Sequence, residues 1–137
     1  MQEKIDIRKK ALIHRKNKYF EVSDNFFKPL IKLLKKQKKN RPIHLSLYYP
    51  ANYEVNVLKL FEIIKINRIK ILFPVTRSKN KMNFVEWQYL DPLKINNFGM
   101  LEPYSKTRPL IPDVMLVPLL AFDSQNNRLG YGKGFYD

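Results

Sequence analysis

The sequence predicts an α/β fold, a three-layer sandwich around a mostly parallel, Rossmann-like sheet. Helix and strand patterns alternate along 137 residues, a length that suits one domain over residues 1–137. Hydrophobic residues make up 45% of the chain, enough for a core without disulfide bonds, and there is no cysteine. Residues 114–118 form a continuous apolar run, which is typical of a buried central strand.

Two helices are expected before the first strand. The first covers residues 3–19, with Ile5, Ala11 and Leu12 among its apolar positions. The second is amphipathic, with Ser23 or Asp24 as a cap and Pro29 in its first turn or at a kink. Its apolar positions recur at helical intervals at Phe27, Leu30, Ile31 and Leu34, and its other side carries Lys28, Lys32, Lys35, Lys36 and Lys39.

The rest of the chain reads as strands with one more helix. We expect strands over residues 43–49, closed by Pro50, and 69–73, closed by Pro74. Between them, residues 55–67 have the broad apolar face of a helix. The later segments are a more exposed strand at 82–87, a loop-rich stretch at 91–112, the buried strand at 114–118 and a turn containing Asp123, Ser124 and Asn126.

The net charge of +14 favours anionic partners, and residues 1–41 contribute +10 of it. The lysines of the second helix allow a nucleic-acid patch, but they are better explained as its solvated face, because no known nucleic-acid-binding pattern accompanies them. The lack of cysteine excludes thiolate zinc sites, iron–sulfur clusters and cysteine nucleophiles. The longest apolar run, residues 114–122, is too short to cross a membrane, and the N-terminus lacks a signal peptide's apolar stretch. A cytoplasmic monomer without a membrane partner is expected.

The chemistry of the chain is concentrated in its last twenty residues. Three of the four glycines alternate there, at Gly130, Gly132 and Gly134, so that backbone N–H groups can approach one anion. Arg128 and Lys133 are suited to phosphate, and Asp137 can supply an oxygen ligand to Mg²⁺. A glycine-rich surface turn with incidental charge explains the pattern about equally well, and the spacing does not name a ligand.

The segments PLLAFD and RLGYGKGFYD resemble the signature of the 5-formyltetrahydrofolate cyclo-ligases (methenyltetrahydrofolate synthetases) in order and spacing. Weaker similarities upstream extend the resemblance over essentially the whole chain; they are Lys4-x-x-x-Arg8, residues 48–54, Phe73-Pro74, residues 82–84 and Glu102-Pro103. The resemblance implies ATP-dependent closure of 5-formyltetrahydrofolate to 5,10-methenyltetrahydrofolate, releasing ADP and phosphate. In that family the formyl oxygen takes the γ-phosphoryl group, and the bridge nitrogen then attacks the activated carbon as phosphate leaves.

The resemblance also implies roles for individual residues. Arg128 and Lys133 would be catalytic, and Asp137 would bind Mg²⁺. The ATP-binding residues would be Lys4, Arg8, Arg128, Leu129, Gly130, Tyr131, Gly132, Lys133, Gly134, Phe135 and Tyr136. The residues that bind the reduced folate would be Tyr49, Glu54, Tyr131, Gly132, Lys133, Gly134 and Phe135.

The residues alone also allow plainer roles. Lys4 and Arg8 could be solvated helix charges, Glu54 could cap the following helix, and Tyr49 could be strand packing. The isolated histidines, His14 and His44, are assigned no chemistry.

The chain departs from the family pattern at Leu119 and Asn127, where the family usually has glycine, and in ending at Asp137. Family members continue through a helix and further strands that supply a second acidic magnesium ligand. C-terminal elements are therefore expected to be missing, as in a truncated or decayed member or in a fragment. The alternatives to an active ligase are a non-catalytic remnant and a basic nucleic-acid-binding protein.

Overall fold

The computed structural model describes residues 1–64, 68–78, 80–104 and 107–136. Its helices are α1 (Gln2–Lys18), η1 (Asp24–Phe27), α2 (Lys28–Lys36), η2 (Val57–Lys59) and α3 (Leu60–Ile63). Its strands are β1 (Ile43–Ser46), β2 (Ile69–Ser78), β3 (Lys81–Glu86), β4 (Leu93–Ile95), β5 (Leu101–Pro103), β6 (Val114–Met115), β7 (Ala121–Phe122) and β8 (Arg128–Leu129). The expected mixed α/β class is confirmed.

The central sheet has four strands in the order β3-β2-β1-β6 and is mainly parallel. β1 runs parallel to β2 and to β6, with Leu45 opposite Ile71 on one side and Val114 on the other. β3 is antiparallel to β2. All four residues of β1 are buried, as expected of a strand between two neighbours.

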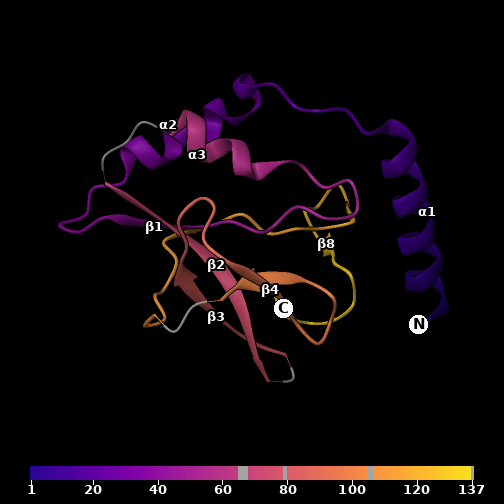
Figure 1. Cartoon of the computed structure of the whole chain (residues 1–137). Coiled ribbons are helices and arrows are strands. Elements are labelled where there is room, and N and C mark those ends of the chain that lie inside the picture. The colour runs from indigo at the N-terminus through magenta and orange to yellow at the C-terminus, as the bar shows by residue number, and fades with distance from the viewer. Residues whose placement is uncertain (65–67, 79, 105–106, 137) are drawn as a thin grey trace.

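α2 and α3 lie on the same side of this sheet, above it in Figure 1. The apolar face of α2 packs as the sequence predicts, with Phe27 and Leu34 buried and its lysines exposed. Together with Leu60 of α3 and Phe73 and Trp87 of the sheet region, these side chains form one core. Pro29 lies in the first turn of α2, also as expected.

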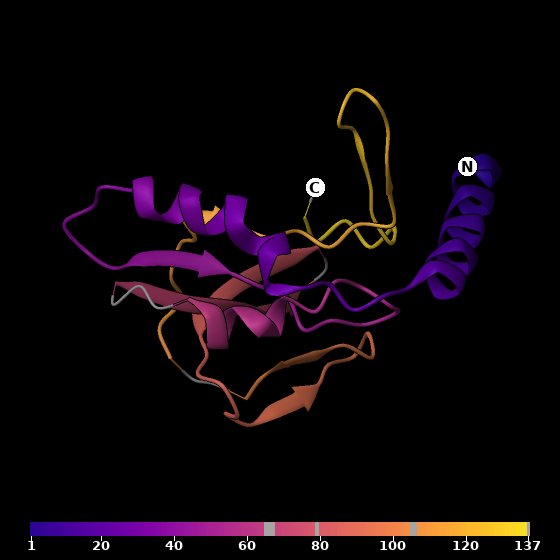
Figure 2. The same cartoon turned by 90° about the horizontal axis from the view of Figure 1, so that it is seen from above.

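α1 occupies the predicted position in the sequence but has no buried residue. Figures 1 and 2 show it standing beside the sheet, next to the hairpin formed by β7 and β8. The fold therefore holds this helix mainly through its longer side chains, two of which are arginines that reach the C-terminal segment.

Several predicted elements need correction. Residues 114–118 are not a buried central strand, because β6 has two residues and lies at the edge of the sheet in the described part of the chain. Val114 and Leu116 instead pack against the core from the edge, and residues 115–121 line a large cavity beside α1. β2 does not end at Pro74 but runs to Ser78, with Pro74 opposite Phe84 of β3. β1 pairs with β2 only as far as Leu72, so at Pro74 the strand has a neighbour on one side only, where proline is tolerated.

The remaining differences concern short elements. The helix expected over 55–67 is a 3₁₀ turn followed by one turn of α3, and residues 65–67 lie outside the described residues. The stretch 91–112 is not only loop, because β4 and β5 pair within it as a hairpin. The turn at Asp123 is confirmed, since its carboxylate accepts hydrogen bonds from the N–H groups of Gln125 and Asn127.

Candidate functional site

A cavity of about 420 Å³ lies where four separate segments of the chain meet. This volume is within the usual range for small-molecule sites. The turn at residues 48–54, the β2–β3 pair, the β4–β5 hairpin and the glycine loop, residues 128–136, all contribute to its lining. The resemblance in the sequence assigns Tyr49 and Glu54 of the first segment and residues 131–135 of the last segment to binding of the reduced folate. The structure brings these two segments together around one cavity.

The backbone of the glycine loop is shaped for two arginine side chains. Gly132 and Gly134 have φ of 85° and 68°, which favour glycine. Arg8 donates from Nε to the carbonyl oxygen of Gly130 at 2.9 Å, and its guanidinium lies where a Cβ on Gly132 would approach to 3.1 Å. A Cβ on Gly130 would come within 2.7 Å of Nη1 of Arg128. Glycine at 130 and 132 therefore lets both guanidinium groups lie against the loop.

Glu54 connects the turn at residues 48–54 to the glycine loop. Its Oε1 accepts a hydrogen bond from the Tyr131 hydroxyl at 2.6 Å, and its Oε2 accepts one from the backbone N–H of Ala51 at 2.8 Å. The bond to Ala51 lies within the turn at residues 51–54. Glu54 does not cap the following helix, because the cap of η2 is Asn56, whose side chain accepts a hydrogen bond from the N–H of Leu58 at 3.2 Å. The bond to Tyr131 connects this carboxylate to the glycine loop, and Glu54 lines the cavity between them.

Three tyrosine hydroxyls near Glu54 stay protonated at neutral pH. Burial, followed by the hydrogen bond and charge of Glu54, raises the pKa of Tyr131 to about 12. Burial is also the largest cause that raises the pKa of Tyr48 and of Tyr136, with the charge of Glu54 second. Tyr131 is therefore a hydrogen-bond donor to Glu54, while Tyr48 donates to the carbonyl of Val55.

The far end of the glycine loop contacts the tip of the β4–β5 hairpin. Lys133 donates from Nζ to the carbonyl oxygen of Phe98 at 3.2 Å and lies 5.1 Å from the centre of its ring. The ring of Phe98 packs edge-to-face on Phe135, with centroids 5.1 Å apart. These contacts close the cavity between the loop and the hairpin.

Sequence reasoning missed the buried carboxylate of Glu102, which is 4% exposed and also lines the cavity. Its Oε2 accepts from the N–H and the hydroxyl of Thr76, at 3.0 and 2.9 Å, and from the side-chain amide of Asn96 at 3.2 Å. Lys94 lies 3.7 Å from its Oε1. The only signal for Glu102 was its place in the Glu102-Pro103 similarity, to which no role was attached.

The structure places the other predicted site residues as follows. Lys4 is exposed on α1, one turn before Arg8. Tyr49 lines the smaller cavity while remaining 36% exposed. Asp137 lies outside the described residues, and among the residues described no group of three His, Asp or Glu side chains could hold a metal ion.

The two residues that depart from the expected glycine pattern, Leu119 and Asn127, both take part in hydrogen bonds. The carbonyl oxygen of Leu119 accepts a hydrogen bond from Nη2 of Arg15. In the turn before β8, the residue with a left-handed backbone is Asn126, with φ of 63°, and not Asn127. Asn127 instead donates from its side chain to Asp123 at 2.8 Å, which stabilises the turn before β8.

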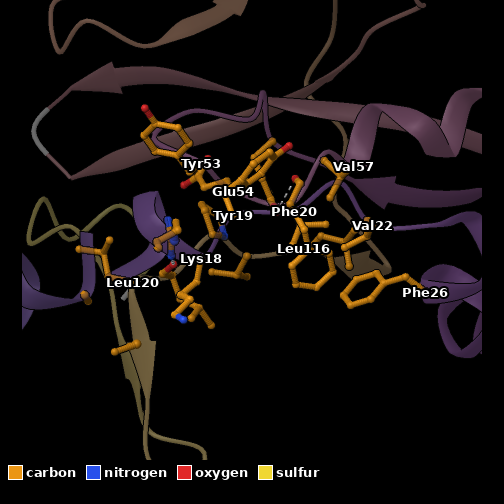
Figure 3. A pocket seen from close by; sticks show the side chains of 18 of the residues that line it. Lys18, Tyr19, Phe20, Val22, Phe26, Tyr53, Glu54, Val57, Leu116 and Leu120 are labelled. Carbon is orange, nitrogen blue, oxygen red and sulfur yellow. Dashed lines mark hydrogen bonds between the residues drawn. The ribbon is translucent and has the colours of Figure 1, made fainter. Parts of the chain in front are cut away.

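A larger cavity of about 1090 Å³ lies between α1 and the body of the protein (Figure 3). Its wall is mostly apolar and includes Phe20, Val22, Phe26 and Leu116, which Figure 3 labels with Glu54. Tyr48, Glu54 and Pro118 line both cavities. Glu54 therefore stands at the boundary between the two.

Comparison with known proteins identifies the family of the chain. A model of the 5-formyltetrahydrofolate cyclo-ligase family matches residues 1–137. The chain belongs to this family. The 5-formyltetrahydrofolate cyclo-ligase of Haemophilus influenzae is 32% identical over 100 residues, covering 69% of this chain and 54% of the relative. That of Mycoplasma pneumoniae is 33% identical over 94 residues, covering 68% and 48%.

Solved structures of cyclo-ligase family members share the fold. The 5,10-methenyltetrahydrofolate synthetase of Aquifex aeolicus superposes with a TM-score of 0.64 at 29% identity, over 97% of this chain and 69% of that one. The synthetase of Mycoplasma pneumoniae gives 0.60 at 27% identity, over 97% and 74%. The chain spans about half the length of the two sequence relatives. In the part of the chain that is described, no helix is long and apolar enough to cross a bilayer.

Proposed function

We propose that this chain carries the nucleotide and folate sites of a 5-formyltetrahydrofolate cyclo-ligase, which converts 5-formyltetrahydrofolate and ATP to 5,10-methenyltetrahydrofolate, ADP and phosphate. One observation carries the proposal. Arg8 and Glu54, which are far apart in the sequence, contact neighbouring residues of the glycine loop, at Gly130 and Tyr131. A basic group and an acidic group from separate segments thus converge on the loop whose sequence resembles the family signature.

The triphosphate of ATP would bind against the glycine loop on the side of Arg8 and Arg128. Both guanidinium groups lie beside loop glycines, where a phosphate can meet backbone N–H groups and a charged fork together. Lys133 would add a third cation from the far end of the loop. In this arrangement Arg128 and Lys133 are the groups that stabilise negative charge on the phosphoryl group during transfer.

The reduced folate would occupy the smaller cavity. Glu54 faces it with a carboxylate that can accept hydrogen bonds from the donor edge of a pterin ring. Tyr49, Met82, Phe98 and Phe135 supply apolar and aromatic surface around it. Such a cavity, mostly apolar with a few fixed polar groups, is the usual form of a cofactor-sized site.

The chemistry requires the protein to position two ligands rather than to supply a nucleophile. Holding the formyl oxygen in line with the γ-phosphorus turns a two-molecule reaction into an effectively unimolecular one. The cations of the loop then offset the charge that develops as the phosphoryl group moves. ATP would enter as its magnesium complex, and no step is assigned to a protein-bound metal ion.

The remaining expectations belong to the same proposal. The complete domain would be a three-layer sandwich, with further elements on the face of the sheet opposite α2 and α3. A monomer in the cytoplasm remains a prediction from the sequence.

The test is a turnover assay with the chain, magnesium-ATP and 5-formyltetrahydrofolate, in which the ultraviolet absorbance of the methenyl product and the release of ADP are followed together. We expect both products in equal amounts, and loss of both in Arg128→Gln. A control, Lys16→Gln, removes an exposed charge from α1 and should behave as the unaltered chain. Binding of both ligands without product would contradict the ligase activity but retain the two sites.

A further inference from the structure

Arg15 is a second arginine through which α1 contacts the C-terminal segment. It lies seven residues after Arg8, two helical turns along, and therefore on the same face of α1. Its Nη1 donates to the Tyr131 hydroxyl at 3.0 Å, and its Nη2 donates to the carbonyl oxygen of Leu119. Neither the sequence motif nor the proposed chemistry assigns this residue a role.

The hydrogen bonds continue from Arg15 through Tyr131 to Glu54. A tyrosine hydroxyl has one hydrogen to donate, and the Tyr131 oxygen already accepts from Arg15, so its hydrogen is directed to Oε1 of Glu54 at 2.6 Å. The other oxygen of Glu54 is held by the N–H of Ala51 at 2.8 Å. Each carboxylate oxygen accepts up to two hydrogen bonds, and within the described segments each oxygen of Glu54 receives one, so a second position on each can accept from a ligand.

These three side chains lie at the boundary between the two cavities. Arg15 lines the larger cavity, Tyr131 lines the smaller one, and Glu54 lines both. The same helix brings Arg8 to the backbone of Gly130. α1 thus contacts the glycine loop through Arg8, and it is linked to the carboxylate of Glu54 through Arg15 and Tyr131.

We propose that Arg15 is a positioning residue for folate binding, which acts through the Tyr131 hydroxyl to hold Glu54 in the orientation that accepts the donor edge of the ligand. The inference rests on the proposed function, since it names a further residue of that folate site. Without Arg15, Tyr131 can rotate its hydroxyl away, and Glu54 loses the partner that fixes one of its two oxygens. The ligand then meets a carboxylate that must first be ordered, which weakens its binding.

A double-mutant cycle on folate affinity tests this proposal. The dissociation constant of 5-formyltetrahydrofolate would be measured by calorimetry for the unaltered chain, Arg15→Gln, Tyr131→Phe and the double variant, with Lys16→Gln as the matched loss of charge on α1. We expect each single variant to bind about tenfold more weakly, and the double variant no more weakly than Tyr131→Phe alone. Arg15→Lys should lie between Arg15→Gln and the unaltered chain, because a single ammonium cannot reproduce the fork.

The outcomes separate this inference from the proposed function. If Arg15→Gln binds the folate as tightly as the unaltered chain, or weakens binding by the same factor with and without the Tyr131 hydroxyl, the positioning role is wrong while the folate site stands. A general effect of Arg15→Gln on folding would weaken folate binding by the same factor whether or not the Tyr131 hydroxyl is present. If the unaltered chain binds neither the folate nor ATP, the proposed function fails and the inference fails with it.

Discussion

Gly132 shows why the loop needs glycine at one particular residue. Its φ of 85° is a conformation that other residues adopt at a cost, and a Cβ there would approach the guanidinium of Arg8 to 3.1 Å. Gly99, at the tip of the β4–β5 hairpin, has a similar φ of 75°, but a Cβ added there would meet no atom within 4 Å. The two glycines share a backbone requirement, and only Gly132 also makes room for a cation.

Replacing these two glycines separates backbone strain from displacement of Arg8. We expect Gly132→Ala and Gly99→Ala to lower the free energy of unfolding by a similar amount, about 1 kcal/mol. Only Gly132→Ala should also weaken ATP binding, by roughly tenfold, because Arg8 is moved from the loop. Thermal denaturation and calorimetric titration with magnesium-ATP measure the two effects. Equal ATP affinity in both variants would contradict the assigned role of Arg8.

Individual site residues were predictable to the extent that they lie in a continuous motif. The glycine loop stands out because its glycines alternate next to Arg128 and Lys133, and Glu54 followed from a weaker similarity. Arg15 could not be found in this way, because it belongs to no motif and stands among the many basic residues of α1. Glu102 was missed for a related reason, since its role depends on Thr76 and Asn96, which only the folded chain brings near it.

At the scale of elements, the β4–β5 hairpin is attached to the edge of β2 through Glu102. The buried carboxylate accepts hydrogen bonds from Thr76 on β2 and from Asn96 at the end of β4. The hairpin tip then contacts the glycine loop through Phe98. Glu102 therefore positions a wall of the smaller cavity as well as stabilising the fold.

Truncation of Glu102 should affect both stability and folate binding. We expect Glu102→Ala to lower the free energy of unfolding by about 1 to 2 kcal/mol, because it leaves the half-buried donors of Thr76 and Asn96 without this acceptor. Glu102→Gln keeps one acceptor oxygen and should lose less. Denaturant unfolding and folate titration of both variants check this. If the alanine and glutamine variants unfold alike, the hydrogen bonds are not the cause.

Asp113 joins the segment before β6 to β1 and to the loop that precedes it. Its side chain is 7% exposed and contacts Arg41 at 2.8 Å, Lys39 at 2.6 Å and the N–H of His44 at 2.9 Å. The hydrogen bond from Arg41 is the largest cause that holds the pKa of Asp113 well below its usual range. This cluster stabilises the parallel pairing of β1 with a two-residue edge strand.

The contribution of Asp113 should depend on pH in a defined direction. Because its folded pKa is depressed, its stabilisation is complete above the unfolded pKa of about 4 and is lost as the pH falls toward the folded value. We expect Asp113→Asn to lower the free energy of unfolding by about 1 to 2 kcal/mol at pH 7. The difference from the unaltered chain should shrink below about pH 4. Denaturant unfolding at several pH values measures it, and a pH-independent difference would contradict the ion pairing.

The sequence predicted the elements whose pattern is local and missed those that depend on distant partners. The spacing of Phe27 and Leu34 suffices to place α2, because its buried face is continuous. An apolar run such as residues 114–118 carries no periodicity, so it cannot tell a central strand from the wall of a cavity. The short hairpin of β4 and β5 has no such local signal. It is held in place by Glu102 of β5, whose hydrogen-bond partner Thr76 lies on β2.

Over the whole molecule, α1 differs from the other described helices in having no buried residue. Arg8 and Arg15 hold it to the C-terminal segment while the core lies under α2 and α3. Elements with few buried contacts open at a lower free energy than the core. A ligand that binds between α1 and the glycine loop would therefore stabilise α1 first.

Hydrogen exchange along the chain tests this arrangement. We expect the amides of α1 to exchange much faster than those of β1 without ligand, and to be protected by magnesium-ATP more than any other helix. In Arg8→Gln this added protection should be lost, whereas Lys16→Gln should retain it. Protection confined to the sheet, with α1 unchanged, would contradict the proposed position of the nucleotide.

Calorimetric titration of the chain with 5-formyltetrahydrofolate, in the presence of magnesium-ATP, measures whether Glu54 and the glycine loop together form a folate site. Glu54→Gln would be compared with Glu62→Gln, a matched change on the exposed side of α3. We expect saturable binding to the unaltered chain, weakened at least about tenfold in Glu54→Gln and unchanged in Glu62→Gln. No binding to the unaltered chain, or equal binding to both variants, would contradict this expectation.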